Sequence, residues 1–264
     1  MSEVISQWRP SHYNKHALVQ YELSLGMIES FNIQRHETIL DVGCGDGRIT
    51  HELALRADQG LVVGVDRTRE MIDFARQQWR DISSLSFQHQ DATELNLEQQ
   101  FDRVTSFNCL HWIRELPKAL AGISRTLKSG GSFAGLVYPR CENLWIPAEE
   151  LETSPRWSDA FQGFINPYEF DDADGYRAKL EQAGFCGIEM VQETKRREFS
   201  CPQEFISYML SWLPHPAQVD DPESFMADWL ARYQALTGQT DDYVYMDYQV
   251  LTFICQKSSS IDEC

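Results

Sequence analysis

Three alternating glycines follow an aspartate in the stretch LDVGCGDGRIT, which contains Asp41, Gly43, Gly45 and Gly47. Glycines let a backbone approach a ligand that a Cβ atom would exclude. The spacing G-x-G-x-G differs from the dinucleotide pattern G-x-G-x-x-G, so pyrophosphate is not the expected ligand. The carboxylate of Asp41 would also repel a phosphate dianion, whereas it would suit a cation. The stretch therefore predicts a strand-to-helix turn that binds a ligand without phosphate; a tight turn without a ligand is the alternative.

Two further acids end the next predicted strands. Asp66 closes the run VVGVD, 21 residues after Gly45, the spacing at which an acid meets ribose hydroxyls in nucleotide-binding α/β folds. Asp91 closes the run QHQD. Such acids commonly cap the next helix, although Thr68 could supply the cap after Asp66. Acids at three consecutive strand ends line one edge of a sheet, and they favour a ligand with a ribose, an adenine and a positive centre, such as S-adenosylmethionine.

A third polar group follows the run FDRVTSF, which predicts a buried strand. Asn108, His111 and Trp112 lie in the next stretch, FNCLHWIREL, where α/β folds often carry their active sites. His111 could act as a general base for a hydroxyl acceptor, although a lone His beside a Trp is more often a structural donor. Trp112 could be a core aromatic, or its indole N–H could hold a polar group of a substrate.

The elements that must position these residues alternate along the chain. Strands are expected in ETILDV, LVVGVD, SFQHQDA, FDRVTSF and SFAGLVYP, and helices in residues 11–35, RITHELALRA, TREMIDFARQQW and PKALAGISRTLKSGG. This alternation predicts a doubly wound, mostly parallel α/β sheet. A helix in DADGYRAKLEQAGF and two strands in CGIEMVQETKRREF and YMDYQVLTFICQK bring the sheet to seven strands.

Two segments rich in aromatic residues interrupt this order, at residues 140–170 and 200–245. Insertions near one edge of a sheet suggest a lid. We therefore expect one domain over residues 1–264, in which residues 1–35 form a helical cap and residues 36–139 form the cofactor-binding core. The two insertions would form a substrate lid.

The composition limits the partners. The formal net charge is −17, and such a field repels nucleic acid and anionic membranes, so a small molecule is the expected partner. The basic cluster of Lys195, Arg196 and Arg197 is typical of a solvated strand edge. The seven cysteines form no C-x-x-C pair, no signal peptide or transmembrane run is apparent, and His and Cys do not cluster at ligand spacing. These features favour a cytoplasmic protein with free thiols and without a metal site. They do not indicate an oligomeric state.

Taken together, the stretches resemble the class I S-adenosylmethionine-dependent methyltransferases. LDVGCGDGRIT is similar to the family's first motif, VVGVDRTREMI to its second, QHQDATEL to its third, and LKSGGSFAGLV to the turn before its fifth strand. The resemblance covers the first half of the chain strongly and the stretch AGFCGIEMV more weakly. It implies a Rossmann-like fold, S-adenosylmethionine as the cofactor, and an antiparallel pair of final strands at the sheet edge, CGIEMVQE and YMDYQVLTFICQ.

The resemblance also implies a set of cofactor-binding residues, which are Asp41, Gly43, Cys44, Gly45, Asp66, Arg67, Met71, Asp91, Ala92 and Asn108. In this set, Asp41 would orient the amino acid part of the cofactor, and Asn108 would lie beside its methionine moiety. Asp66 would bind the ribose hydroxyls. Asp91 would accept a hydrogen bond from the adenine amino group.

Within the class, the chain is similar to a group of carboxylate O-methyltransferases that includes trans-aconitate methyltransferase and insect juvenile hormone acid methyltransferase. The shared features are an N-terminal W-x-P-x-x-Y segment, the stretch LHWI and the block FSCPQEF; the first contains Trp8, Pro10 and Tyr13. A carboxylate is already ionised at neutral pH, so its methylation needs no base. Its oxygen must lie about 3 Å from the methyl group, with water excluded.

This similarity implies that Trp112 holds the acceptor carboxylate, and Gln20 matches a position that holds it in the insect family. Two alternatives remain open. His111 could be the base for a hydroxyl or carbon acceptor, or the chain could bind the cofactor without catalysis. A nicotinamide oxidoreductase would use the same sheet, but the chain lacks the G-x-G-x-x-G form.

Overall fold

A computed structural model describes residues 18–258, which divide into two compact units. We call them the core unit and the helical unit; their described residues are 18–139, 168–192 and 250–258 for the first, and 140–167 and 193–249 for the second. The motif residues Trp8, Pro10 and Tyr13 lie outside the described part of the chain, as does the beginning of the expected cap. No helix within residues 18–258 is long and apolar enough to cross a membrane.

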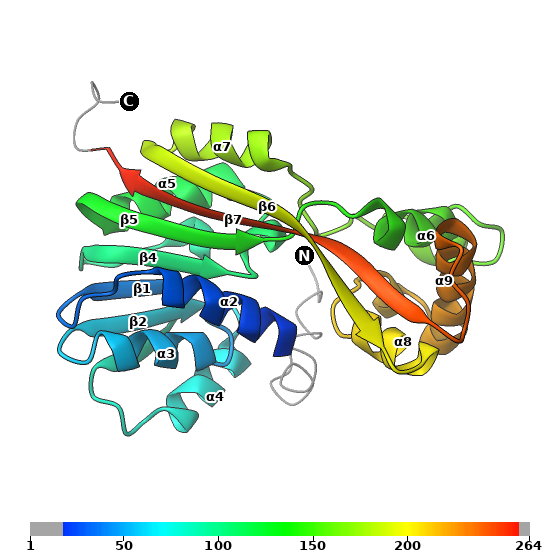
Figure 1. Ribbon diagram of the computed structural model, residues 1–264, viewed down its shortest axis with the longest axis horizontal. Helices are drawn as coiled ribbons and strands as arrows, with labels where there is room; N and C mark the ends of the chain where they lie inside the picture. Colours follow the sequence, from blue (N-terminus) through cyan, green and yellow to red (C-terminus); the bar gives the residue numbers. More distant parts are fainter. Residues whose placement is uncertain (1–17, 259–264) are drawn as a thin grey trace. The chain divides into compact units, whose positions relative to one another are not determined.

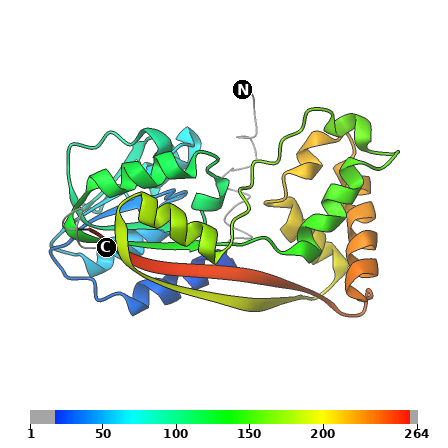
Figure 2. The same cartoon turned by 90° about the horizontal axis from the view of Figure 1, so that it is seen from above.

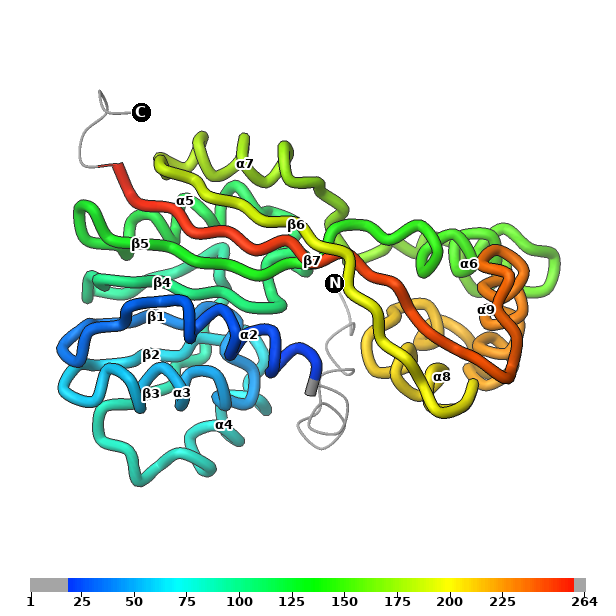
Figure 3. The backbone as a smooth tube through the Cα atoms, viewed as in Figure 1, coloured from blue at the N-terminus to red at the C-terminus, as the bar shows by residue number. Residues whose placement is uncertain are grey.

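A seven-stranded sheet of order β3-β2-β1-β4-β5-β7-β6 confirms the doubly wound, mostly parallel fold (Figures 1 and 3). β1 to β5 pair in parallel, and β7 runs antiparallel to β5. The central strands TILDV and LVVGVD are buried almost throughout, as expected for strands that are covered on both faces. The bounds are Thr38–Val42 for β1, Leu61–Asp66 for β2, Leu85–His89 for β3, Phe101–Phe107 for β4, Leu127–Val137 for β5, Phe185–Phe199 for β6 and Val244–Lys257 for β7.

Helices cover both faces of the core-unit sheet. α5 and α7 lie together on one face, and α2 and α3 lie together on the other (Figure 2). Each amphipathic helix turns its apolar side to the strands, so that Leu40, Val104 and Phe133 are fully buried. The bounds are Leu18–Ser30 for α2, Arg48–Arg56 for α3, Arg69–Gln78 for α4, Leu116–Thr126 for α5 and Ala173–Gln182 for α7.

Two of the expected helix ends are wrong. The first helix ends at Ser30 instead of residue 35, and α5 ends at Thr126, so that the stretch LKSGG belongs to β5. Leu127 pairs with Phe101 and is fully buried, which draws the chain into the sheet as soon as the helix ends. The register then shifts between Phe101 and Arg103, and the glycines occupy this irregularity instead of closing a helix.

The helical unit collects elements from both segments that were expected as insertions. They are α6 at Glu142–Glu152, η4 at Ser158–Phe161, α8 at Pro202–Leu210, η5 at His215–Gln218 and α9 at Pro222–Thr237. α6 packs on α9, and α8 also contacts α9. Its centre is aromatic: the Trp229 ring lies 5.2 Å from Tyr233 and 5.4 Å from Phe205, centroid to centroid. The helical unit therefore has a core of its own.

Two glycine-to-alanine substitutions in the core unit should change stability in opposite directions. Gly135 faces Phe253 across β5 and β7, and a Cβ there would lie 2.2 Å from the ring. Gly135→Ala should lower the free energy of unfolding by about 1–3 kcal/mol. Gly26 in α2 is exposed and nothing lies within 4 Å of an added Cβ, so Gly26→Ala should raise it by up to about 1 kcal/mol. Urea denaturation of both variants would test the packing; a neutral Gly135→Ala would contradict it.

Candidate functional site

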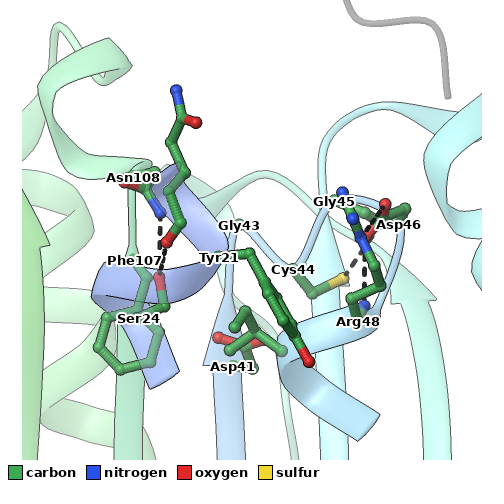
Figure 4. A pocket seen from close by; sticks show the side chains of 12 residues that line it. Tyr21, Ser24, Asp41, Gly43, Cys44, Gly45, Asp46, Arg48, Phe107 and Asn108 are labelled. Atoms are coloured by element: carbon green, nitrogen blue, oxygen red, sulfur yellow. Dashed lines mark hydrogen bonds and ion pairs between the residues drawn. The ribbon is translucent and has the colours of Figure 1, made fainter. Parts of the chain in front are cut away.

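A cleft of about 420 Å³ opens in the core unit, at the carboxyl end of β1 (Figure 4). Six of the predicted site residues line it: Gln20, Asp41, Gly43, Cys44, Gly45 and Asn108. The remaining lining residues are Tyr21, Ser24, Asp46, Arg48, Ile49 and Phe107. The cleft is therefore built by α2, by the turn between β1 and α3, and by the end of β4.

The turn after β1 needs glycine at two positions for different reasons. Gly43 has φ +78°, and a Cβ there would lie 2.3 Å from Cys109 Sγ. Gly45 has φ +52°, but nothing lies within 4 Å of its added Cβ, so its open side faces free space. Gly43 is thus required by packing, whereas Gly45 leaves room for a ligand close to the backbone.

Asp41 is a buried carboxylate beneath this turn, with 2% of its surface exposed. Thr50 Oγ1 on α3 donates to its Oδ2 at 2.8 Å, and Thr105 Oγ1 on β4 donates to its Oδ1 at 3.0 Å. Burial raises the pKa of Asp41 to about 6, and the two hydroxyl hydrogen bonds act in the opposite direction. A nearby positive charge would compensate for the burial of the ionised form, so the cleft suits a cationic ligand.

Asp66 at the end of β2 connects the second motif to the glycine turn. Its Oδ2 accepts a hydrogen bond from Gly45 N at 3.0 Å, and its Oδ1 accepts one from Thr68 N at 2.8 Å. Thr68 is the N-cap residue of α4, yet its side chain makes no capping bond. Burial raises the pKa of Asp66, while the backbone hydrogen bonds oppose this shift. Each carboxylate oxygen keeps a lone pair for a further donor, such as a ribose hydroxyl.

The other predicted cofactor residues do not line the cleft. Arg67 is exposed, and Met71 lies on the buried side of α4, with 2% of its surface exposed. Asp91 caps the short helix η2, Ala92–Glu94, where its Oδ1 accepts from Thr93 N at 2.8 Å. Because β2 and β3 pair in parallel, Asp66 and Asp91 still share one edge of the sheet. The structure thus brings the residues of the first motif together in the cleft. The residues expected around the adenine lie outside the cleft.

Asn108 has an unusual backbone at the end of β4. Its φ of 59° is the single positive φ of a non-glycine residue among residues 18–258. Its Oδ1 accepts from Tyr138 Oη at 2.6 Å, and its Nδ2 donates to Ser24 Oγ at 3.2 Å. Ser24 Oγ donates in turn to the Gln20 carbonyl at 2.7 Å, so it can only accept from Asn108. This chain of hydrogen bonds fixes the amide orientation and leaves the second N–H of Nδ2 available for a ligand.

His111 and Trp112 belong to the short helix η3, Leu110–Trp112, and neither lines the cleft. They form an aromatic cluster with Tyr138 and Tyr168. The His111 ring centroid lies 5.3 Å from Tyr138 and 4.8 Å from Tyr168, and that of Trp112 lies 4.9 Å from Tyr168. Since Tyr138 also donates to Asn108, the aromatic cluster is connected to the cleft.

His111 is poorly suited to accept a proton. Its surface is 2% exposed, and its Nδ1 is buried without a hydrogen-bond partner among the described residues. Burial lowers the pKa of His111 to about 3, because the imidazolium form would lose its hydration. The side chain is therefore neutral at physiological pH and a weak base there.

Sequence reasoning missed several residues of this site. Tyr138 directly follows β5. Its place at the end of a strand is the same signal by which Asp66, Asp91 and Asn108 were predicted. Ser24 lies four residues after Gln20, on the same side of α2. Asp46 and Arg48 lie within the glycine stretch and form an ion pair at 2.8 Å. The signals were thus present as strand ends and helical spacing, whereas their hydrogen bonds required the three-dimensional structure.

Comparisons with known proteins agree with this arrangement. A family model described as a methyltransferase domain matches residues 39–131. The viral protein 235L of Invertebrate iridescent virus 6, named as a methyltransferase, is 24% identical over 95% of this chain and 93% of its own. Malonyl-[acyl-carrier protein] O-methyltransferase of Brevibacillus brevis is 29% identical over 74% of this chain and 72% of its own. Juvenile hormone acid O-methyltransferase of Drosophila melanogaster is 29% identical over 56% of this chain and 54% of its own.

The fold is also similar to solved structures. The YcgJ protein of Bacillus subtilis superimposes with a TM-score of 0.65 at 16% identity, covering 90% of this chain and all of that protein. At this identity the likeness concerns the fold alone. The family model, the relatives and the fold agree with one another. Together they support a class I S-adenosylmethionine-dependent methyltransferase, the family that the sequence resembles.

Proposed function

We propose that this methyltransferase transfers the methyl group of S-adenosylmethionine to a carboxylate of a small molecule, giving a methyl ester. One observation carries the proposal. The histidine beside the site, His111, has its pKa lowered to about 3 by burial, so it is a poor base for a hydroxyl or carbon acceptor. A carboxylate acceptor needs no base, because it is ionised at neutral pH.

The residues of the core unit fit the cofactor. The open side of Gly45 leaves room for it at the cleft, and the buried Asp41 carboxylate would attract its positive charge. When bound, S-adenosylmethionine supplies an electrophilic methyl group on a sulfonium. In our proposal, Asp66 accepts from the ribose hydroxyls, Asp91 from the adenine amino group, and the spare N–H of Asn108 donates to the cofactor carboxylate. Gly43, Cys44, Arg67, Met71 and Ala92 would provide the surrounding surface.

Two relatives support an oxygen acceptor on an acid. Their names describe O-methyltransferases of juvenile hormone acid and of malonyl-[acyl-carrier protein]. We propose that Gln20 and the indole N–H of Trp112 hold the acceptor carboxylate in this chain, with Gln20 at the cleft and Trp112 in the aromatic cluster. We also propose that the helical unit selects the acceptor, as expected of a substrate lid.

Product analysis tests the reaction class. The full chain would be incubated with S-adenosylmethionine carrying a labelled methyl group and a panel of apolar and dicarboxylic acids, and the products would then be treated with base. Methyl esters release labelled methanol on this treatment, whereas methyl ethers and C-methyl products do not. Cofactor binding without turnover of any acid would support a non-catalytic relative instead.

Replacing Asp66 should weaken cofactor binding. A carboxylate that accepts from two hydroxyls makes charge-assisted hydrogen bonds of about 1.5–3 kcal/mol each, so Asp66→Ala should raise the cofactor Kd at least about tenfold. Asp73→Ala is the matched control, since Asp73 is an exposed acid on α4. Calorimetry would give both Kd values, and thermal melting would verify that the variants are folded. Equal affinity in the Asp66 and Asp73 variants would contradict the assignment.

Cofactor affinity should depend on pH through Asp41. Its pKa is about 6 in the folded protein, so below that pH a proton must leave before a cationic ligand can use the carboxylate. The affinity should fall by about tenfold per pH unit below about 6 and level off above it. Asp41→Asn should bind more weakly with a shallower pH dependence, whereas Asp58→Asn at the surface should behave as the wild type. Calorimetry between pH 5 and 8 would measure these curves.

The same raised pKa affects stability without a ligand. Folding favours the protonated form of Asp41, so its stabilising contribution is present at low pH and is lost as the pH rises through about 6. Asp41→Asn should therefore gain stability relative to the wild type above pH 6 but not at pH 4. The reverse trend would show that the ionised carboxylate is stabilised in the empty cleft.

The two aromatic-cluster residues should differ in their effect on turnover. Trp112→Phe keeps most of the ring but removes the indole donor, and turnover should fall roughly ten- to a hundredfold. His111→Gln should cost less, because no base is needed. At saturating cofactor, the rate should stay flat from about pH 7 to 9. Steady-state kinetics on the best acceptor would measure turnover of both variants. A large loss of turnover in His111→Gln together with nearly normal turnover in Trp112→Phe would favour a hydroxyl or carbon acceptor.

A further inference from the structure

Arg197 in the helical unit is a partly buried cation without an ion-pair partner among residues 18–258. It lies on β6 with its guanidinium over two aromatic rings, 4.4 Å from the Tyr208 centroid and 5.0 Å from the Phe199 centroid. Its Nη1 is buried and has no hydrogen-bond partner within the described part of the chain. A buried donor without an acceptor is rare in native proteins and calls for an explanation.

The two cations that precede Arg197 on β6 both have ion-pair partners. Lys195 pairs with Glu193 at 2.6 Å, and Arg196 pairs with Asp247 at 2.7 Å. The chain has 40 acidic residues against 23 Lys and Arg, so acidic partners are abundant. No carboxylate of residues 18–258 pairs with Arg197. The basic cluster is therefore not a uniform solvated edge, because its last member turns toward the aromatic centre of the helical unit.

A second unpaired donor follows the helix that carries Tyr208. Trp212 lies two residues after the end of α8, and its Nε1 is also buried without a hydrogen-bond partner in the described part of the chain. Arg and Trp side chains can only donate hydrogen bonds. Both groups therefore need the same kind of ligand atom, an acceptor oxygen.

We infer that Arg197 is the anion-binding group of a ligand site in the helical unit, and that its ligand is a carboxylate attached to an apolar body. A guanidinium matches a carboxylate in a two-pronged geometry, and removal from water strengthens the pair. Phe199 and Tyr208 are only 7% and 6% exposed, so the surroundings of the guanidinium are apolar and favour a ligand with an apolar body.

This inference goes beyond the proposed function and does not depend on it. The anion site itself requires neither the cofactor nor a methyl transfer. Binding can therefore be measured on the protein alone, so that failure of the site and failure of the proposed reaction are separate results.

Calorimetry with phenylacetate and octanoate tests the site, using the full chain without cofactor. Phenylacetamide serves as the uncharged analogue and sulfate as an anion without an apolar body. The acids should bind, and the amide and sulfate should bind at least about tenfold more weakly, since a charge-assisted pair is lost in one case and the apolar contact in the other. Arg197→Met should weaken acid binding at least about tenfold. Arg196→Met, a neighbouring exposed cation, should leave it within about twofold.

Thermal melting of the empty proteins gives a second readout. Burying an unpaired guanidinium is unfavourable, so Arg197→Met should melt at the wild-type temperature or above it, and Arg197→Lys should keep weakened acid binding. A lower melting temperature of Arg197→Met with unchanged acid binding would identify a purely structural arginine and overturn the proposal. Three further binding results would also overturn the proposal: equal affinity for the acids and the amide, higher affinity for sulfate than for the acids, or equal losses of acid affinity in Arg197→Met and Arg196→Met. The absence of binding of either acid at about 10 mM, where even weak binding is detectable, would overturn it as well.

Discussion

The buried carboxylate of Asp41 is the constraint on which the site depends. Its two oxygens are held by hydroxyls from different elements, Thr50 on α3 and Thr105 on β4, so one charge joins the first strand to its neighbours. Taking a carboxylate out of water is unfavourable, and the raised pKa is the measure of that penalty. A cation in the cleft relieves it. The empty protein is thus destabilised at the place where a sulfonium and an ammonium group would be most strongly attracted.

The turn above Asp41 depends on a second carboxylate for its shape. Gly45 donates its amide to Asp66, which fixes the turn relative to β2 before any ligand arrives. On the other side, the Tyr138–Asn108–Ser24 hydrogen bonds tie the ends of β5 and β4 to α2. The strained backbone of Asn108 persists because its side chain is held at both ends. The site is therefore preorganised by polar contacts between elements that are distant in sequence.

Much of this arrangement was predictable, because the periodic strands and the residues that end them are local signals. The glycine turn, Asp66 and the order of alternating elements all follow from spacing along the chain. The irregularity at the start of β5 was not predictable. LKSGG is typical of a helix end, and it becomes part of a strand because Leu127 pairs with Phe101. The difference between Arg196 and Arg197 was also hidden: adjacent residues of one charged triplet point to opposite faces of a strand, and only their contacts distinguish them.

The position of β7 has a consequence for synthesis of the chain. β7 pairs with β5, but Cys255 comes 122 residues after the Phe133 carbonyl that it meets. At roughly 5–20 residues per second, a ribosome takes about 6 to 24 seconds to make that interval. During this time the outer edge of β5 has no strand beside it, and both segments of the helical unit are being produced. The nascent protein must therefore carry an open sheet edge until β7 emerges, and an open edge is a template for aggregation.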